Sequence, residues 1–495
     1  MQKISLKREP NLKSKFEPFI YQKQAVEFVK DLPYAAIFHE QGLGKTKIAI
    51  DIMLYWLKNG IIDTVIYLTK KSLIANWEKE LKNHTFMKPR VLSQNLAGNF
   101  YVFNSPARLV LTHFEVLVSE KDRLELFCKT RNVAIIIDES AKMKNPESKI
   151  TQTLFALSDL FQKRIIMTGT PVANRPYDIW AQIYFLDKGK SLGDDFDYFR
   201  KSADLKNSYI DNLETRKDFE DSINIIFSKI SGFSVRETKG SGIIELPNKE
   251  YHVITCDWEF YQKDMYEQIK KELRIVIKKD GKLKEDSSES VLKRLLRLIQ
   301  VTSNPKLIDS SYYDQPGKFR ILENIVQTII NKGEKVIVWT TFIDNVKWLT
   351  SEFKDYGAVK IYGGMNIADR NESVERFLTD NDAKVLIATP ASAKEGLTLT
   401  VANHAIFYDR NLSLDDYLQA QDRIHRISQT KTCHIYNLIM KDSIDEWIDA
   451  LIKSKYLAAQ LAQGDITLET YQQNSNYDYG KIVHEILEMG DEANE

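Results

Sequence analysis

Cysteine is scarce in this sequence: there are three residues, Cys128, Cys256 and Cys433, and they lie far apart. None belongs to a Cys-x-x-Cys pair or to a Cys/His spacing typical of zinc, and the pattern does not favour a disulfide framework. We therefore expect a reduced, intracellular protein. Its place would be the cytoplasm or nucleoid if the source is prokaryotic or viral, and the nucleus if it is eukaryotic.

Long apolar runs and an excess charge are also missing. No run approaches the roughly 18–20 residues of a membrane helix, and the first residues lack the apolar core of a signal peptide. Lys and Arg together number 69, as do Asp and Glu, so the net charge of zero points to no particular partner. A nucleic-acid surface, if present, must therefore be local.

A glycine-rich segment, residues 39–46 (His-Glu-Gln-Gly-Leu-Gly-Lys-Thr), lies between an apolar strand-like run and a helix-like run. Glycines at a strand-to-helix turn let backbone N–H groups approach a triphosphate at the positive end of a helix. Lys45 would reach the β- and γ-phosphates, and Thr46 would bind Mg²⁺. Because His39 occupies the first position, the full Gly-x-x-x-x-Gly-Lys-Thr pattern is not met. A glycine-rich turn beside a surface lysine is the alternative.

Two further segments fit such a site. The apolar run 133–137 ends in Asp138-Glu139, and the carboxyl end of a parallel strand is where open sheets bind ligands. Asp138 can hold Mg²⁺ through water, and Glu139 can orient and deprotonate the attacking water. Small hydroxyl residues around a glycine, Met167-Thr168-Gly169-Thr170-Pro171, suit a loop that senses the metal site. Polar strand ends without catalytic roles are the alternative for both.

Two arginines, Arg423 and Arg426, are three residues apart, on one face of a helix or tight turn. The arginine fork suits the charge of a transferring phosphoryl group. A solvated basic face is the alternative.

Together these motifs resemble the Swi/Snf-type branch of the superfamily-two helicases, the ATP-driven translocases on double-stranded DNA. The resemblance covers roughly residues 16–460, and the run 419–429 (Gln-Ala-Gln-Asp-Arg-Ile-His-Arg-Ile-Ser-Gln) is close to diagnostic. The sequence departs from the family at His39, Ser140, Ala141 and Ser428. The family has a histidine where this sequence has Ala141. Its replacement would remove a contact that links hydrolysis to the second lobe.

The resemblance implies ATP and Mg²⁺ as cofactors, bound in a cleft between two lobes. The catalytic residues that it implies are Lys45, Asp138, Glu139, Arg423 and Arg426. The nucleotide-binding residues that it implies are Gln22, Gly42, Leu43, Gly44, Lys45, Thr46 and Gly396. The metal ligands that it implies are Thr46 and Asp138. Candidate DNA contacts are Lys70, Thr112, His113, Thr341, Lys394 and Thr398. We expect a monomer that acts on double-stranded or branched DNA, with other DNA-processing proteins as partners and no membrane partner.

The predicted fold is α/β, with two RecA-like parallel-sheet lobes, helical insertions and a C-terminal helical extension. Strands are expected at 34–38, 64–69, 108–112, 133–138 and 164–168, and at 334–339, 358–362, 384–389, 404–408 and 433–438. Residues 1–240 would form the first lobe with an insertion at about 175–235. Residues 241–440 would form the second with a protrusion at about 255–312, including an amphipathic helix at 291–299 and a solvated loop at 281–290. Residues 441–495 would be a helical extension with an acidic tail.

Four rival functions stay open from sequence. A remodeller that reanneals or migrates branched DNA is the nearest, and residues 396–400 (Gly-Leu-Thr-Leu-Thr) slightly favour it. A strand-separating RNA helicase fits the arginine motif less well. A non-hydrolysing DNA-binding scaffold conflicts with the intact carboxylates and arginines. A motor subunit of a restriction or defence complex would need its nuclease on another chain.

Overall fold

The computed structural model describes residues 9–172, 174–204, 213–241, 246–280, 285–393, 397–426 and 428–474. The chain divides into two units. The N-terminal unit comprises Met1–Glu245 together with Leu457–Asn474, and the C-terminal unit includes Leu246–Tyr456. Helix α18 (Ile444–Ala462) begins in the second unit and ends in the first. Among the described residues, no helix has both the length and the apolar character needed to cross a bilayer.

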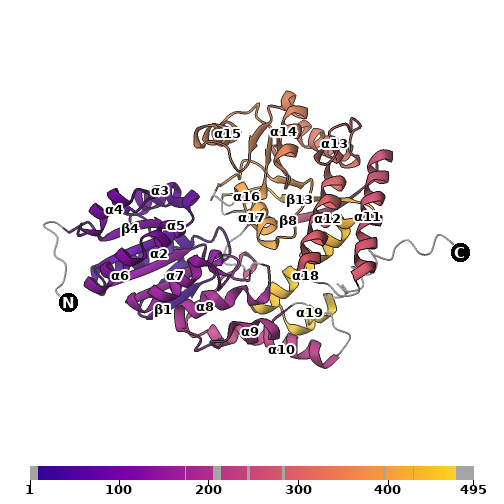
Figure 1. Ribbon diagram of the computed structural model, residues 1–495. Coiled ribbons are helices and arrows are strands. Elements are labelled where there is room, and N and C mark those ends of the chain that lie inside the picture. The colour runs from indigo at the N-terminus through magenta and orange to yellow at the C-terminus, as the bar shows by residue number, and fades with distance from the viewer. Residues whose placement is uncertain are drawn as a thin grey trace. The chain divides into compact units, whose positions relative to one another are not determined.

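The N-terminal unit is built on a sheet of seven parallel strands in the order β3-β4-β2-β5-β6-β1-β7. The strands are β1 (Tyr34–Ile37), β2 (Thr64–Thr69), β3 (Arg90–Val91), β4 (Leu109–His113), β5 (Val133–Asp138), β6 (Lys163–Met167) and β7 (Ser234–Val235). The helices between them are α1 (Ile20–Val29), α2 (Lys45–Lys58), α3 (Ile74–His84), α4 (Leu96–Phe103), α5 (Phe114–Ser119), α6 (Lys121–Thr130) and α7 (Lys149–Leu157). After β6 come α8 (Trp180–Asp187), α9 (Phe196–Ser202) and α10 (Leu213–Ile230), which form the helical insertion (Figure 1).

The core of this unit explains why its strands read as continuous apolar runs. Strand β2 is buried along its whole length, and in β5 only the terminal Asp138 is partly exposed. Parallel strands covered by helices on both faces need apolar side chains in both directions. One face packs against α2, whose Ile48, Ile52 and Trp56 are almost fully buried.

The C-terminal unit has a six-stranded parallel sheet in the order β10-β11-β9-β12-β13-β8. Its strands are β8 (Lys249–Cys256), β9 (Val336–Trp339), β10 (Val359–Ile361), β11 (Val385–Ala388), β12 (His404–Phe407) and β13 (Cys433–Met440). Its helices are α11 (Phe260–Asp280), α12 (Glu285–Ser303), α13 (Gly317–Asn331), α14 (Ile343–Glu352), α15 (Ile367–Thr379), α16 (Pro390–Ala393) and α17 (Leu414–Gln421). Helix α19 (Leu468–Asn474) follows α18.

Alternate residues of these strands feed two separate cores. Ile337, Ala405 and Ile435 face the core that contains residues of α15 and α17. Val338 and Ile406, one residue further along, face the core that contains α13 and α14. The two faces of this sheet are therefore distinct surfaces.

The predicted fold class, two parallel α/β sheets with helical insertions, is confirmed, and each of the ten expected strands is present within two residues of its expected bounds. The expected amphipathic helix lies within α12. The loop expected at 281–290 is wrong from residue 285 onwards, because α12 begins at Glu285. The start of that helix is charged and rich in serine, a composition typical of a solvated loop, and for this reason the helix was not predicted there. Residues 281–284 and the acidic tail lie outside the described residues.

Candidate nucleotide site and arginine motif

The phosphate loop joins β1 to α2. Gly42 and Gly44 have φ values of 91° and 70°, a left-handed conformation that favours glycine. Gly44 caps α2, so the first N–H groups of that helix lie at this turn. A helix N-terminus reached through such a turn is suited to an anion.

Gln22 lies directly against this loop. A Cβ atom added to Gly44 would lie 2.3 Å from Gln22 Nε2, so a larger residue here would displace the Gln22 amide. The Gln22 side chain is buried and accepts a hydrogen bond from the Phe19 backbone N–H over 3.0 Å. Tyr21 donates to the Leu43 carbonyl over 3.0 Å. The start of α1 therefore fixes the loop from one side, and adenine recognition by Gln22 stays a prediction.

Lys45 and Gly169 close the other side of the loop. Lys45 Nζ donates to the His39 carbonyl over 2.9 Å. A Cβ atom at Gly169 would lie 3.0 Å from the Gln41 N atom and 3.3 Å from Lys45 Nζ. The glycine of the loop after β6 thus allows direct packing on the phosphate loop.

His39, the departure noted in the sequence, is buried beside this lysine. Burial, and to a smaller extent the positive charge of Lys45, lowers its pKa to about 4. His39 is therefore neutral at physiological pH and adds no charge to the loop.

The two carboxylates follow β5. Asp138 Oδ2 accepts from Trp77 Nε1 over 2.8 Å, and its Oδ1 accepts from the Glu139 N–H over 3.0 Å. Burial, together with the charge of Glu139, raises the pKa of Asp138 to about 6, and the charges of Lys45 and Lys70 act in the opposite direction. A cation at this carboxylate would favour its charged form.

Glu139 has an unusual backbone. Its φ and ψ are 57° and 47°, one of three non-glycine residues with positive φ in the described part of the chain. Non-glycine residues in this region store strain of about 1–3 kcal/mol and concentrate at functional sites. Its carboxylate is buried and lies 3.5 Å from Lys70 Nζ.

The strand order brings these motifs together. Strand β6 lies between β5 and β1, with Met167 opposite both Asp138 and Ile37. The phosphate loop, the carboxylate pair and the Thr168–Pro171 loop therefore leave one edge of the sheet side by side. The residues present fit a Mg²⁺–triphosphate group, because they supply loop amides, an ammonium, a hydroxyl and two carboxylates.

A buried link joins two of these loops. Ser140 begins the short 3₁₀-helix η2 (Ser140–Met143), and Gln182 lies on α8. Ser140 Oγ donates to Gln182 Oε1 over 2.8 Å, and Gln182 Nε2 donates to the Pro171 carbonyl over 2.9 Å. The segment after β5 is thus bonded to the segment after β6.

The arginine motif lies in the C-terminal unit. Arg423 is fully buried, and its Nη1 donates to the Leu397 carbonyl over 3.4 Å. Arg426 donates from Nη1 to Thr398 Oγ1 over 2.7 Å and from Nε to the Asp422 carbonyl over 2.9 Å. Burial lowers the pKa of Arg426 from its ordinary value. The segments around residues 398 and 426 therefore form one bonded group; Gly396 and Lys394 lie outside the described residues.

The structure places the other candidate DNA contacts in varied surroundings. Thr112 and His113, at the end of β4, are buried, and His113 Nδ1 lies 2.7 Å from Glu115 Oε2. The Thr341 N–H donates to Asp409 Oδ1 over 2.6 Å. Lys70 pairs with Glu139, as described above. The DNA-contacting role of all six residues stays a prediction.

Several hydrogen-bonded pairs at and near the site were not predicted from the sequence. Trp77 bonds to Asp138, Gln182 to Ser140, and the buried Asp409 accepts hydrogen bonds from Thr340 and Ser303 over 2.6 Å each. These partners are 42 or more residues apart along the chain, so no local spacing could indicate them.

Comparison with known proteins agrees with the geometry. The family described as the SNF2-related domain matches residues 21–307, more than half of the chain. The chain belongs to the SNF2-related family. The helicase conserved C-terminal domain matches residues 317–428 of this SNF2-related protein.

Two relatives illustrate the family. The SNF2-related chain is 28% identical over 439 residues to an uncharacterized ATP-dependent helicase of Mycoplasma pneumoniae, covering 86% of the chain and 40% of the relative. It is 27% identical over 448 residues to the chromatin structure-remodeling complex subunit snf21 of Schizosaccharomyces pombe, covering 84% of the chain and 36% of the relative. The chain thus spans about two fifths of the length of such relatives.

Among solved structures, the Sulfolobus solfataricus SWI2/SNF2 ATPase core in complex with dsDNA is similar over 94% of the chain and 98% of that structure. Its sequence identity is 23% and its TM-score is 0.43.

Proposed function

We propose that this SNF2-related protein hydrolyses ATP and uses the energy to move along double-stranded DNA. The observation that carries the proposal is the meeting of three loops at one edge of the N-terminal sheet, after β1, β5 and β6. Together they offer the phosphate-binding groups, the metal ligands and the general base that phosphoryl transfer to water uses.

Each residue has a role in this proposal. The amides of the glycine-rich loop and Lys45 bind the phosphates. Thr46 and Asp138 hold Mg²⁺, which neutralises charge on the phosphate oxygens. Glu139, held 3.5 Å from Lys70, accepts a proton from the attacking water. Arg423 and Arg426 stabilise the transferring phosphoryl group, and Gln22 recognises the adenine.

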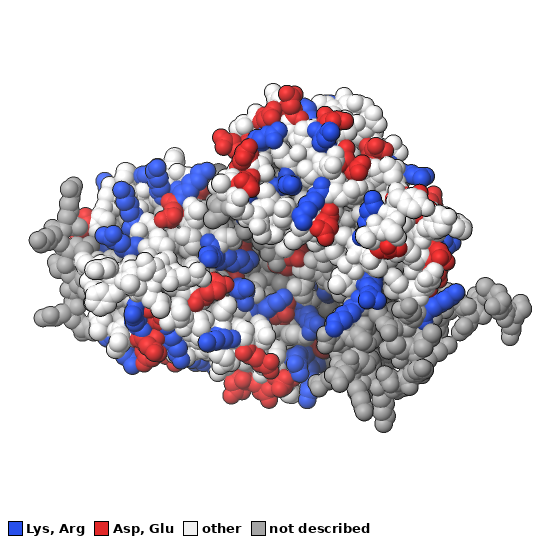
Figure 2. All heavy atoms as spheres, turned by 45° about the horizontal axis from the view of Figure 1, so that its top comes forward, with Lys and Arg blue, Asp and Glu red and all other residues white. Residues whose placement is uncertain are grey.

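DNA as the track is supported by the family and by the names of relatives that remodel chromatin. Both acidic and basic side chains occur over the face in Figure 2, in keeping with the zero net charge. We propose that the contacts with DNA are local and go mainly to phosphates, through the candidate residues 70, 112, 113, 341, 394 and 398. Such contacts carry little sequence specificity and are sensitive to salt.

The deciding experiment is the ATPase rate without nucleic acid and with single-stranded, duplex and forked DNA and RNA. Duplex DNA should stimulate the rate most. A rate that no nucleic acid changes would contradict the proposal, and a complete lack of hydrolysis would favour the scaffold rival.

A triplex-displacement assay tests movement. ATP should drive removal of a third strand from duplex DNA, with little unwinding of a forked duplex. DNA affinity should fall with salt. A plot of the logarithm of the binding constant against the logarithm of the salt concentration should have a slope of about −0.9 per phosphate neutralised on B-form DNA. Efficient unwinding of a long duplex without third-strand displacement would overturn the translocase proposal, and preferential migration of a branched substrate would favour the remodeller of junctions.

A further inference from the structure

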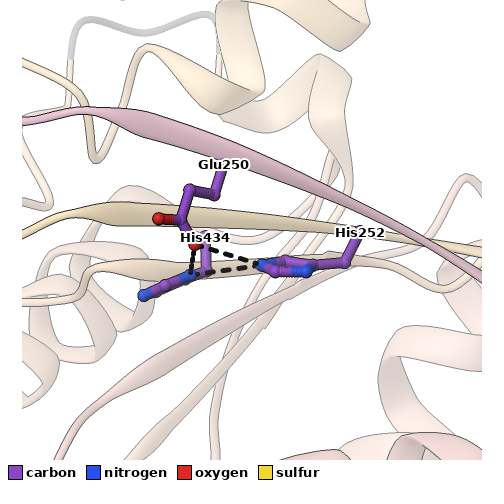
Figure 3. Close-up of side chains that lie close together, drawn as sticks. All are labelled: Glu250, His252 and His434. Atoms are coloured by element: carbon purple, nitrogen blue, oxygen red, sulfur yellow. Dashed lines mark hydrogen bonds and ion pairs between the residues drawn. The ribbon is translucent and has the colours of Figure 1, made fainter.

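Three side chains with metal-binding atoms meet in the C-terminal unit (Figure 3). Glu250 and His252 lie on β8 and His434 lies on β13. His252 Nε2 is 3.2 Å from His434 Nδ1. Glu250 Oε2 is 3.3 Å from His434 Nδ1 and 3.9 Å from His252 Nε2. Three potential donor atoms thus form a compact triangle.

The sheet register explains the meeting. Glu250 is directly opposite His434, and His252 is opposite Tyr436. Residues two apart on a strand point to the same face, so all three side chains emerge on one side of the sheet. This is the face that carries Cys256, Leu438 and Met440 into the core beneath α13 and α14.

Neighbouring rings hold the two imidazoles in place. The His434 ring stacks on His404 with centroids 4.9 Å apart and an angle of 13°, and the His252 ring stacks on Tyr436 at 4.7 Å and 21°. His404 is itself fixed, because its Nε2 lies 2.8 Å from Glu334 Oε2. Metal ligands whose rings are oriented by surrounding contacts need less reordering on binding.

We propose that Glu250, His252 and His434 form a binding site for a divalent transition-metal ion of the Zn²⁺ class. In a tetrahedral zinc site with bonds of about 2.0–2.2 Å, ligand atoms lie about 3.3–3.6 Å apart. The two shorter edges of the triangle are close to this range. The third can shorten because the Glu250 side chain is 54% exposed and can rotate. Two imidazoles and a carboxylate, with water as the fourth ligand, suit zinc.

The site is separate from the arginine motif. On the opposite face of β8, Tyr251 OH donates to Gln421 Oε1 over 2.9 Å and Lys249 lies 3.6 Å from Asp422. A single strand thus contacts the motif region with one set of residues and presents the proposed ligands with the alternate set.

A bound ion would tie β8 to β13. Strand β8 is the edge strand of the sheet and the first strand of the C-terminal unit, and β13 is its one neighbour in the sheet. A ligand that binds the folded state alone stabilises that state. We therefore expect Zn²⁺ to stabilise the C-terminal unit by cross-linking its entry strand.

The test is a Zn²⁺ titration of the full-length, tag-free protein against a chromophoric chelator, in excess Mg²⁺ so that oxygen-rich sites are already filled. One equivalent should bind, and Co²⁺ should give the visible absorption of tetrahedral coordination. His252→Gln and His434→Gln should each lower the affinity more than roughly tenfold. They should also abolish the rise in Tm that Zn²⁺ produces in the wild type.

The matched control is His84→Gln, which removes a histidine that lies 3.4 Å from a single carboxylate, Glu80, on α3. It should leave the titration unchanged. Circular dichroism in chelator verifies that each variant is folded. Wild-type protein that binds no Zn²⁺, or binding that survives both substitutions, would show that the triangle is only a hydrogen-bonded group and would overturn the proposal.

Discussion

Ser140 and Gln182 are joined by a hydrogen bond of 2.8 Å between fully buried side chains. Gln182 Nε2 also donates to the carbonyls of Pro171 and Asp178, over 2.9 Å and 3.0 Å. Within the N-terminal unit, this amide connects the loop that carries Asp138 and Glu139 to the loop that packs on the phosphate site. Ser140 and Ala141, two of the departures expected from the sequence, therefore lie at or beside this connection.

We expect Ser140→Ala and Gln182→Leu each to destabilise the protein by about 1–3 kcal/mol, because each leaves a buried polar partner unsatisfied. The double variant should lose less than the sum, with a coupling energy of about 0.5–3 kcal/mol. Urea unfolding of the four proteins measures this. If the link transmits the state of the nucleotide site, kcat of the double variant should be lower than that of the wild type, even under conditions in which the variant is fully folded. Strictly additive stabilities would contradict the coupling.

Substitution of Glu139 by Gln should preserve ATP binding and slow hydrolysis by about 10²–10⁴-fold, because the amide cannot accept the proton of the attacking water. The side chain keeps its length, so the left-handed backbone and the site geometry should change little. Lys45→Ala should instead lose phosphate binding. Equilibrium binding of a fluorescent nucleotide separates the two effects. Wild-type turnover by Glu139→Gln would assign the base to another residue.

Gly44→Ala should weaken nucleotide binding, because a φ of 70° strains alanine and the new methyl group, 2.3 Å from Gln22 Nε2, would displace that amide. Gly464→Ala is a matched control. Its φ of 74° is close to the 70° of Gly44, but a Cβ atom there meets nothing within 4 Å. The control should lose only the stability that alanine costs at a positive φ, and it should bind nucleotide normally. Nucleotide binding by Gly44→Ala as tight as that of Gly464→Ala would contradict a part for this glycine and its contact with Gln22 in shaping the loop.

Arg426→Ala should abolish ATP hydrolysis and leave DNA affinity nearly unchanged, because we assign its guanidinium to the γ-phosphate. Thr398→Val removes the acceptor 2.7 Å from Arg426 Nη1 and tests whether that bond positions the arginine. We expect it to lower kcat with little change in KM for ATP. DNA binding by fluorescence anisotropy completes the test. Loss of DNA binding with normal basal hydrolysis would place Arg426 on the nucleic acid.

The lowered pKa of His39 predicts that the protein loses stability in acid. Its pKa of about 4 in the folded protein is below the unfolded value of 6.5, so the unfolded state takes up a proton first as the pH falls. The free energy of unfolding should decrease from about pH 6.5 down to about pH 4, by about 3 kcal/mol in total. His39→Gln should flatten this part of the profile in denaturant titrations. An unchanged slope in His39→Gln would contradict the assignment.

The parts of the fold that were predictable from sequence are those with strong local patterns. Apolar runs such as 133–137 and 385–388 marked strands because both their faces are buried. Strand β8 was missed, since an edge strand with exposed Glu250, Tyr251 and Val253 carries no apolar run. Strands β3 and β7 were missed because each has two residues.

The same distinction applies to the site. Residues 42–46 and the pair Asp138-Glu139 are contiguous, so their chemistry is readable from the sequence. Trp77 and Gln182 act on partners 61 and 42 residues away, and such pairings arise only when strands and helices pack. His252 and His434, 182 residues apart, gave no metal-binding spacing for the same reason.

The N-terminal unit is made of two stretches of chain that are distant in sequence. Arg236, directly after the edge strand β7, pairs with Asp465, and its Nε lies 2.9 Å from Asp465 Oδ1 across 229 residues. A nascent chain leaves the ribosome from its N-terminus, so β1 to β7 emerge long before the segment Leu457–Asn474, which completes their unit. The N-terminal unit is therefore completed only after residues 246–456 of the C-terminal unit have been synthesised.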